Sequence, residues 1–123
     1  MSDFTEPLYP KPLEIICYHC QQAVEKAIKA IIISYGAQGG MPKKHNLSFL
    51  LEQIKNKVEI PEKYYDYADA LTPYGIAVRY PNELDIEERH VRDALLYAQE
   101  IVGWSEKIVK QRGTLGPGPI KKE

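Results

Sequence analysis

The chain has 123 residues, of which 44% are hydrophobic and 27% are charged, and these proportions are typical of one soluble globular domain. The formal net charge is −1, so the whole chain lacks the excess positive charge that attracts nucleic acid or an anionic membrane surface. The first ten residues, MSDFTEPLYP, lack the basic and apolar segments of a secretory signal, and the longest apolar run, AIII, is far too short to span a bilayer. With only two cysteines, these features predict a cytoplasmic protein without a membrane-spanning segment.

Residues 1–12 contain three prolines and are expected to form an extended lead-in, because proline interrupts a helix. The next segment, from Leu13 to about Tyr35, is predicted to be a helix that ends at the glycine-rich stretch YGAQGG. At 100° per residue its apolar side chains fall within one arc of about 140°. This arc contains Leu13, Ile16, Cys17, Cys20, Ala23, Val24, Ala27, Ala30 and Ile31. Its alanines make the arc shallow, which favours the close approach of a neighbouring helix.

Two shorter helices are expected next. The stretch HNLSFLLEQIKN predicts a helix over about residues 46–57, because its apolar residues recur with helical spacing at Leu47, Leu50, Leu51 and Ile54. A further helix is predicted from Pro61, a favoured first-turn residue, to Leu71. Pro73 should break that helix and leave a short helical piece over residues 72–78.

The longest helix is predicted from Asp85, as its N-cap, to about Gln111. Its apolar stripe consists of Val91, Ala94, Leu95, Ala98, Ile101, Val102, Ser105 and Ile108. Residues 111–123 are rich in glycine and proline and are expected to form a flexible tail. No segment alternates as a strand does, so the sequence predicts an all-α, up-down bundle of about four helices that occupies residues 13–110.

Cys17 and Cys20 lie three residues apart with His19 between them, a combination that occurs in metal and redox sites. A structural zinc site needs about four converging ligands, whereas His19 points about 100° away from Cys20 on a helix. A thioredoxin-like motif has its first cysteine at the start of a helix, and here both cysteines fall inside the predicted helix. We therefore expect two core thiols, with no metal site and no cofactor.

The same helix carries a polar stripe beside its apolar arc, formed by His19, Gln22, Lys26 and Lys29. The run that contains it, CYHCQQAVEKAIKA, resembles the signature helix of the HEPN (higher-eukaryote and prokaryote nucleotide-binding) domain family. Two later segments, KHNLSFLL and LTPYGIAVRYPNE, resemble that family's His-Asx-Leu-x-x-Leu-Leu helix and its Tyr…Arg-Tyr-Pro segment. A long closing helix follows them, so the resemblance covers about residues 13–110.

This resemblance implies a bundle of four or five helices that usually dimerises. Many prokaryotic members pair with a small nucleotidyltransferase in two-component or toxin–antitoxin systems, and others are metal-independent RNases with an Arg-x4–6-His motif. Arg79 matches the arginine of that motif, but the window for the histidine holds Leu84, Asp85 and Ile86, and the next histidine is His90. The proton-transfer partner that the RNases use is therefore missing from its usual position.

Members of the family generally open with a long helix before the signature run, and here residues 1–12 stand in its place, so that helix is short or missing. Either the bundle is one helix short, or the start of the chain is truncated relative to its relatives. Such a gap predicts an exposed apolar groove that a dimer partner would cover.

The resemblance implies nucleotide or phosphate binding by Arg79, because a guanidinium offers several donors to a phosphate; a structural arginine is the alternative. Tyr80 is expected either to stack on a base or to pack beneath the last helix. His19, Gln22 and Lys26 are expected either to line the same cleft or to form a polar surface or dimer-interface network.

Other aromatic and basic residues are expected to have structural roles. Tyr64, Tyr65, Tyr67 and Tyr74 are predicted to lie in the core and at interfaces rather than to form a base-stacking platform. His90, beside Arg89 and Arg92, is predicted to lie on a solvated helix face rather than in a functional basic patch.

Two functional hypotheses follow. The first is a non-catalytic, dimeric nucleotide-binding and interaction subunit that partners a small nucleotidyltransferase. The alternative is a metal-independent RNase toxin with a non-standard site, in which Arg79 stabilises the transition state and His19 or His90 replaces the missing acid–base group.

Overall fold

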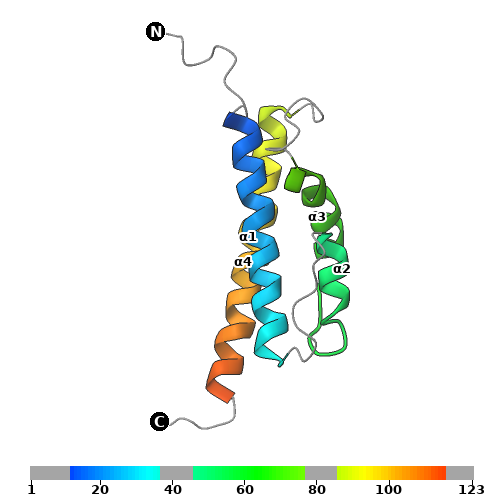
Figure 1. The fold of residues 1–123 in the computed structure, drawn as a ribbon, viewed down its shortest axis with the longest axis vertical. Coiled ribbons are helices and arrows are strands. Elements are labelled where there is room, and N and C mark those ends of the chain that lie inside the picture. The colour runs from blue at the N-terminus through cyan, green and yellow to red at the C-terminus, as the bar shows by residue number, and fades with distance from the viewer. Residues whose placement is uncertain (1–11, 37–45, 77–85, 116–123) are drawn as a thin grey trace.

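The computed structural model of the protein describes residues 12–36, 46–76 and 86–115. These residues form the helices α1 (Pro12–Ser34), α2 (Leu47–Glu52), α3 (Lys63–Leu71) and α4 (Glu88–Leu115), and a 3-10 helix η2 (Thr72–Ile76). The long helices α1 and α4 lie side by side, and the shorter α2 and α3 lie together on one side of them (Figure 1). The prediction of an all-α bundle of four helices is confirmed, and the described ranges contain no strand.

The directions of the helices follow from contacts between their ends. The guanidinium of Arg112, near the end of α4, lies 3.4 Å from the carbonyl oxygen of Ser34 at the end of α1, so these two helices run parallel. The amide of Leu47 at the start of α2 donates to Thr72 Oγ1, just after α3, at 3.1 Å, so α2 and α3 run antiparallel. Figure 1 shows that α1, α2 and α4 run in one direction and α3 runs in the other, so the helices do not alternate in direction as the predicted up-down arrangement requires.

Helix α1 begins and ends within one residue of its predicted bounds, but its buried side differs from the prediction. Ile16 and Ala23, which belong to the predicted arc, are exposed, whereas Glu14, Gln21 and Glu25 are buried. The buried arc is rotated by about 80° around the helix from the predicted one. The reason is that α2, α3 and η2 cover the side of α1 that carries Gln21 and Glu25, in addition to the contact with α4.

Helix α2 is a single short stretch that begins at an N-cap. The side chain of Asn46 accepts a hydrogen bond from the amide of Phe49 at 2.9 Å, and the four apolar residues predicted from the spacing, Leu47, Leu50, Leu51 and Ile54, are all buried. The helix ends at Glu52 rather than at Lys57, because the amides of Gln53 and Ile54 bond the third residue before them and tighten the chain into turns.

Helix α3 begins at Lys63 instead of Pro61 and ends at Leu71, as predicted, and Pro73 follows within η2. Residues 77 and 78, the remainder of the short helical piece expected there, lie outside the described residues.

Helix α4 begins at Glu88, and the predicted N-cap Asp85 lies outside the described residues. The helix continues to Leu115, four residues beyond its predicted end at Gln111, and its last turn is held by the contact of Arg112 with α1. Leu95, a member of the predicted buried stripe, is 46% exposed because it lines an open cavity between α1 and α4. The expected lead-in and the end of the expected tail fall on residues 1–11 and 116–123, also outside the described ranges.

Candidate functional site

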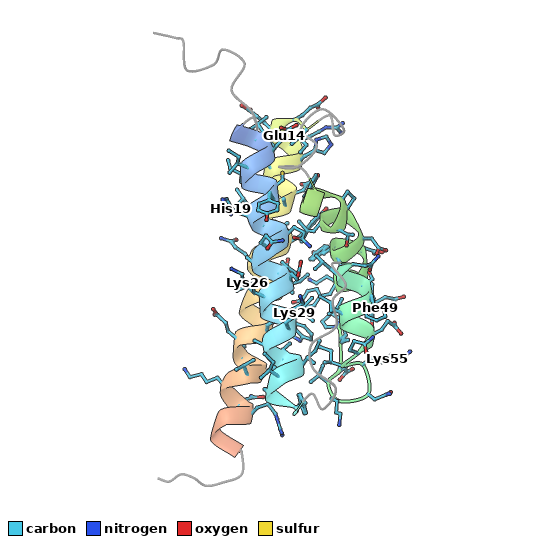
Figure 2. The ribbon with its side chains drawn as sticks, viewed as in Figure 1. Glu14, His19, Lys26, Lys29, Phe49 and Lys55 are labelled. Carbon is cyan, nitrogen blue, oxygen red and sulfur yellow. The ribbon has the colours of Figure 1, made fainter. Side chains whose placement is uncertain are left out.

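Three of the five predicted site residues, His19, Gln22 and Lys26, lie on α1, and the other two, Arg79 and Tyr80, lie outside the described residues. His19 and Lys26 are exposed, as a polar stripe requires. Lys26 points away from α2 and α3, whereas Lys29 points toward them (Figure 2). Gln22 is half-buried, and its Nε2 donates to Gln21 Oε1 at 2.7 Å. Of the predicted residues on α1, Gln22 therefore belongs to a hydrogen-bond network, whereas His19 and Lys26 lie on the exposed surface.

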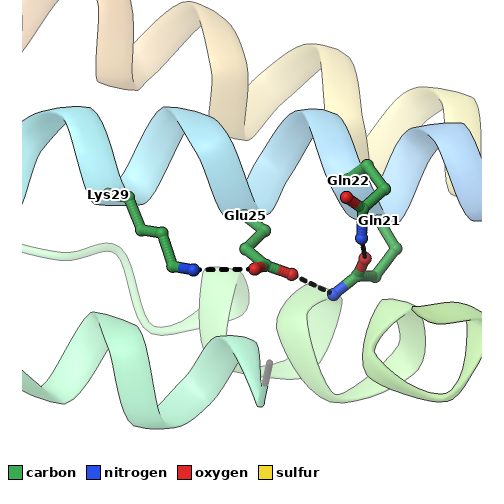
Figure 3. Close-up of polar contacts among 4 residues, drawn as sticks. All are labelled: Gln21, Gln22, Glu25 and Lys29. Carbon is green, nitrogen blue, oxygen red and sulfur yellow. Dashed lines mark hydrogen bonds and ion pairs between the residues drawn. The ribbon is translucent and has the colours of Figure 1, made fainter. Parts of the chain in front are cut away.

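That network is a ladder of four polar side chains along α1, which we call the α1 ladder: Gln22, Gln21, Glu25 and Lys29 (Figure 3). Gln21 Nε2 donates to Glu25 Oε1 at 3.0 Å, and Lys29 Nζ donates to Glu25 Oε2 at 2.9 Å. The ladder lies on the side of α1 that faces α2 and α3 (Figure 3). Both oxygens of the buried carboxylate thus have a donor, which offsets the cost of removing the charge from water.

The sequence analysis missed Gln21 and Glu25. A signal was present, because Gln21, Glu25 and Lys29 recur every four residues and so share one side of a helix that also carries Cys17, Val24 and Ile28. As polar residues they are absent from the predicted apolar arc, and only the covering layer shows that they are buried. Gly75 of η2 forms part of that layer, since a Cβ atom there would lie 3.2 Å from the Gln21 side chain.

A second feature is an apolar groove between α1 and α4, which we call the α1/α4 groove. It consists of two cavities of about 400 and about 250 Å³ that follow one another along the two helices. Its lining comes from α1 and α4 alone, so it opens on the side that α2 and α3 leave uncovered. The lining residues are Ile16, His19, Cys20, Ala23, Ala27 and Ala30 of α1, and Leu95, Ala98, Gln99, Val102, Ser105, Glu106, Val109 and Lys110 of α4.

The groove explains why the predicted apolar arc of α1 contains several alanines. Ala23, Ala27 and Ala30 form its shallow floor on the α1 side, and His19 stands on its rim. The hydroxyl of Ser105 is buried in the smaller of the two cavities without a hydrogen-bond partner among the described residues.

Comparison with known proteins identifies the family of the chain. The family model described as the HEPN domain matches residues 8–108.

The chain belongs to the HEPN domain family. The match confirms the resemblance carried by the three sequence motifs. No curated protein and no solved structure matches the chain.

In this HEPN domain the signature run forms the middle of α1 and presents the α1 ladder on one side and the α1/α4 groove on the other. The His-Asx-Leu motif has a structural explanation, because its Asn46 caps α2 and its Leu47 is fully buried. The Tyr…Arg-Tyr-Pro segment begins at η2, whose Gly75 packs against Gln21.

Both cysteines of the HEPN signature are buried, which confirms that they are core residues. Burial raises the pKa of the Cys17 thiol to about 11, with a further contribution from Cys20, and burial also raises the pKa of Cys20. Both groups are therefore neutral thiols at physiological pH, which are poor nucleophiles and poor metal ligands. Among the described residues, no group of three His, Cys, Asp or Glu side chains is arranged to hold a metal ion.

The remaining candidates have structural contacts. His90 Nδ1 accepts a hydrogen bond from the backbone amide of Glu87 at 2.8 Å, just before α4 begins. Arg89 forms an ion pair with the carboxylate of Glu87 at 3.0 Å. Tyr64 is buried with its ring 5.2 Å from that of Trp104, and Tyr67 stacks on Tyr97 at 4.1 Å, which confirms their packing role. No helix within the described ranges combines the length and the apolar character needed to cross a bilayer.

Proposed function

We propose that this HEPN protein is a homodimeric interaction subunit whose two copies pack through the α1/α4 groove, and that it partners a small nucleotidyltransferase and binds a nucleotide phosphate. The observation that carries the proposal is the groove itself, an almost wholly apolar surface along both long helices that the other described helices leave uncovered. Exposed apolar surface of this kind on a protein of 123 residues indicates a partner.

The size of the surface favours a second copy of the chain. Helix α1 has 23 residues and is about 34 Å long, and two adjacent helices present a face about 20 Å wide. The resulting area of about 700 Å² is close to the about 800 Å² per partner of a stable interface. Two such faces would form a four-helix bundle around a two-fold axis, in which the alanines allow the close approach of the facing helices.

The nucleotide part of the proposal rests on Arg79 and Tyr80, with His19, Gln22 and Lys26 on α1. It is supported by family membership and by the position of His19 on the rim of the groove. A dimer through the groove would bring the two His19 rims to one interface, where a shared site for an anionic ligand could form.

Light scattering coupled to size-exclusion chromatography tests the dimer. The wild type is expected at about twice the chain mass of 14.1 kDa. Leu95→Asp should be monomeric, because Leu95 is 46% exposed in the free chain and lines the groove, so a carboxylate there is tolerated by the monomer and excluded from the interface. Leu96→Asp is the matched control, since Leu96 is 48% exposed and is not among the groove residues.

A wild type that elutes as a monomer at all concentrations, or equal dissociation by both aspartate variants, would contradict the proposed dimer.

A second experiment distinguishes the RNase alternative from the interaction subunit: the wild-type protein is incubated with mixed-sequence RNA in EDTA. We expect the RNA to stay intact; cleavage that disappears in Arg79→Ala would show an RNase with a non-standard site.

A further inference from the structure

A third cavity, of about 300 Å³, lies at the end of the bundle where α1 and α4 terminate, and we call it the end cavity. Three segments that are far apart in the sequence meet there: the residue after α1, the turns between α2 and α3, and the last turns of α4 (Figure 1). Its lining residues are Tyr35, Val58, Glu59, Trp104, Ile108, Gln111 and Arg112. It shares none of these residues with the α1/α4 groove or with the five predicted site residues.

The guanidinium of Arg112 is held in place at one wall of the end cavity. It stacks on the ring of Tyr35, with 4.2 Å between the guanidinium carbon and the ring centroid. Its Nε and one terminal nitrogen each donate to the carbonyl oxygen of Ser34 at 3.4 Å. These two bonds use two of the five N–H groups of a guanidinium, so further donors are held in a fixed orientation.

The chemistry of the lining differs from that of the groove. The groove is almost wholly apolar, whereas the end cavity combines the indole of Trp104, aliphatic side chains and the polar groups of Arg112, Gln111 and Glu59. A second cation lies close by, since Lys57 Nζ is 5.9 Å from the centroid of the Tyr35 ring. Apolar and aromatic walls with a few convergent polar groups are typical of small-molecule sites, and the volume is at the lower end of their range.

We propose that the end cavity binds a small planar aromatic molecule with one anionic group, the ring lying against Trp104 and the anion bonded to Arg112. The anionic group is a phosphate or a carboxylate, because a guanidinium binds both through paired N–H groups. The exposed carboxylate of Glu59 disfavours a second anionic group on the ligand and offers an acceptor to a ligand N–H or O–H. This site goes beyond the proposed dimer and does not depend on it.

The test uses the fluorescence of Trp104, the only tryptophan of the 123 residues and a residue that lines the end cavity. The wild-type protein is titrated with AMP and with nicotinate, two planar rings that carry a phosphate and a carboxylate, and with their neutral counterparts adenosine and nicotinamide. We expect saturable quenching by at least one of the two anions and binding at least about tenfold weaker by its neutral counterpart. Which anion binds distinguishes a phosphorylated ligand from a carboxylated one.

Variants assign the binding to particular residues. Arg112→Gln should weaken binding of the anion by at least about tenfold, and the exposed Arg92→Gln on the same helix is the matched control. Glu59→Gln should strengthen binding, and its exposed position leaves the fold intact, which circular dichroism checks for all three variants. The proposal is overturned by an absence of saturable quenching with every probe. It is equally overturned by Arg112→Gln and Glu59→Gln proteins that both bind as the wild type does.

Discussion

Gln21 is fully buried and Glu25 is 95% buried, although both are polar side chains in the middle of a long helix. A polar group that loses its contact with water without a new hydrogen bond destabilises the folded state, so each of these groups depends on its partners. In the α1 ladder the carboxylate accepts one bond from the amide of Gln21 and one from the ammonium of Lys29. The ladder therefore couples two successive turns of α1 to each other beneath η2.

Replacing Gln21 with leucine tests this coupling. Gln21→Leu should lower the free energy of unfolding by about 1–3 kcal/mol, because Glu25 then loses a donor while it stays buried. The exposed Lys26→Leu on the same helix is the control and should change the free energy of unfolding by less than about 0.5 kcal/mol, since Lys26 lies outside the ladder. Urea unfolding followed by circular dichroism measures both values, and equal losses would show that the ladder contributes nothing specific.

At the scale of single elements, α2 shows how tertiary contacts sustain a short helix. An isolated helix of six residues is not stable in water, because the cost of nucleation exceeds the gain from so few hydrogen bonds. Here the N-cap of Asn46, the bond from the amide of Leu47 to Thr72 and the burial of three leucines supply the missing stability. The segment KHNLSFLL, which the sequence analysis compared with a HEPN motif, thus serves to cap α2 and to pack its leucines into the core.

The contribution of the cap can be measured directly. Asn46→Ala should lower the free energy of unfolding by about 1 kcal/mol, because the amide of Phe49 loses its acceptor at the start of α2. Asn56→Ala, at an exposed asparagine in the turns after the helix, serves as the control and should change stability by less than about 0.5 kcal/mol. A loss of the same size in both variants would assign the effect to turn propensity rather than to capping.

For the whole molecule, the other described helices cover the parallel pair of α1 and α4 on one side only. Helices α2 and α3 lie on that side (Figure 1) and complete a core there. The α1/α4 groove follows the side of the pair that α2 and α3 leave uncovered. The buried thiols and several phenols of this core have raised pKa values, mainly because burial disfavours their charged forms. These groups are Cys17, Cys20, Tyr64 and Tyr74.

Alkaline pH should therefore destabilise the fold. A group whose pKa is higher in the folded state than in the unfolded state keeps its proton on folding, so its contribution is complete below the unfolded pKa and is lost as pH rises through the folded one. For Cys17 this window extends from 9.0 to about 11. The melting temperature should fall steadily between these pH values, and Cys17→Ser should show a shallower decline because its hydroxyl does not titrate there. A flat profile in the wild type would contradict the burial of neutral thiols.

The sequence alone determined the helical segments, the family and the identity of many core residues. Helical spacing located α1 within one residue and identified Leu47, Leu50, Leu51 and Ile54 as buried, because apolar side chains at this spacing leave water together. It also assigned the cysteines to the core, since their positions inside a helix excluded the geometry of a redox or zinc site. Three motifs in order indicated the HEPN family, which the match over residues 8–108 shows.

Only the tertiary structure decided which side of each helix is covered. Periodicity gives the angles between side chains on one helix but not the neighbours that pack on it, so Ile16 and Leu95 were assigned to the core and are exposed. The sequence analysis did not identify Gln21 and Glu25 as buried, because the bonds that make their burial favourable exist only once α1 is folded beneath η2. The end cavity, too, depends on three distant segments meeting in space, and no pattern within any one of them predicts it.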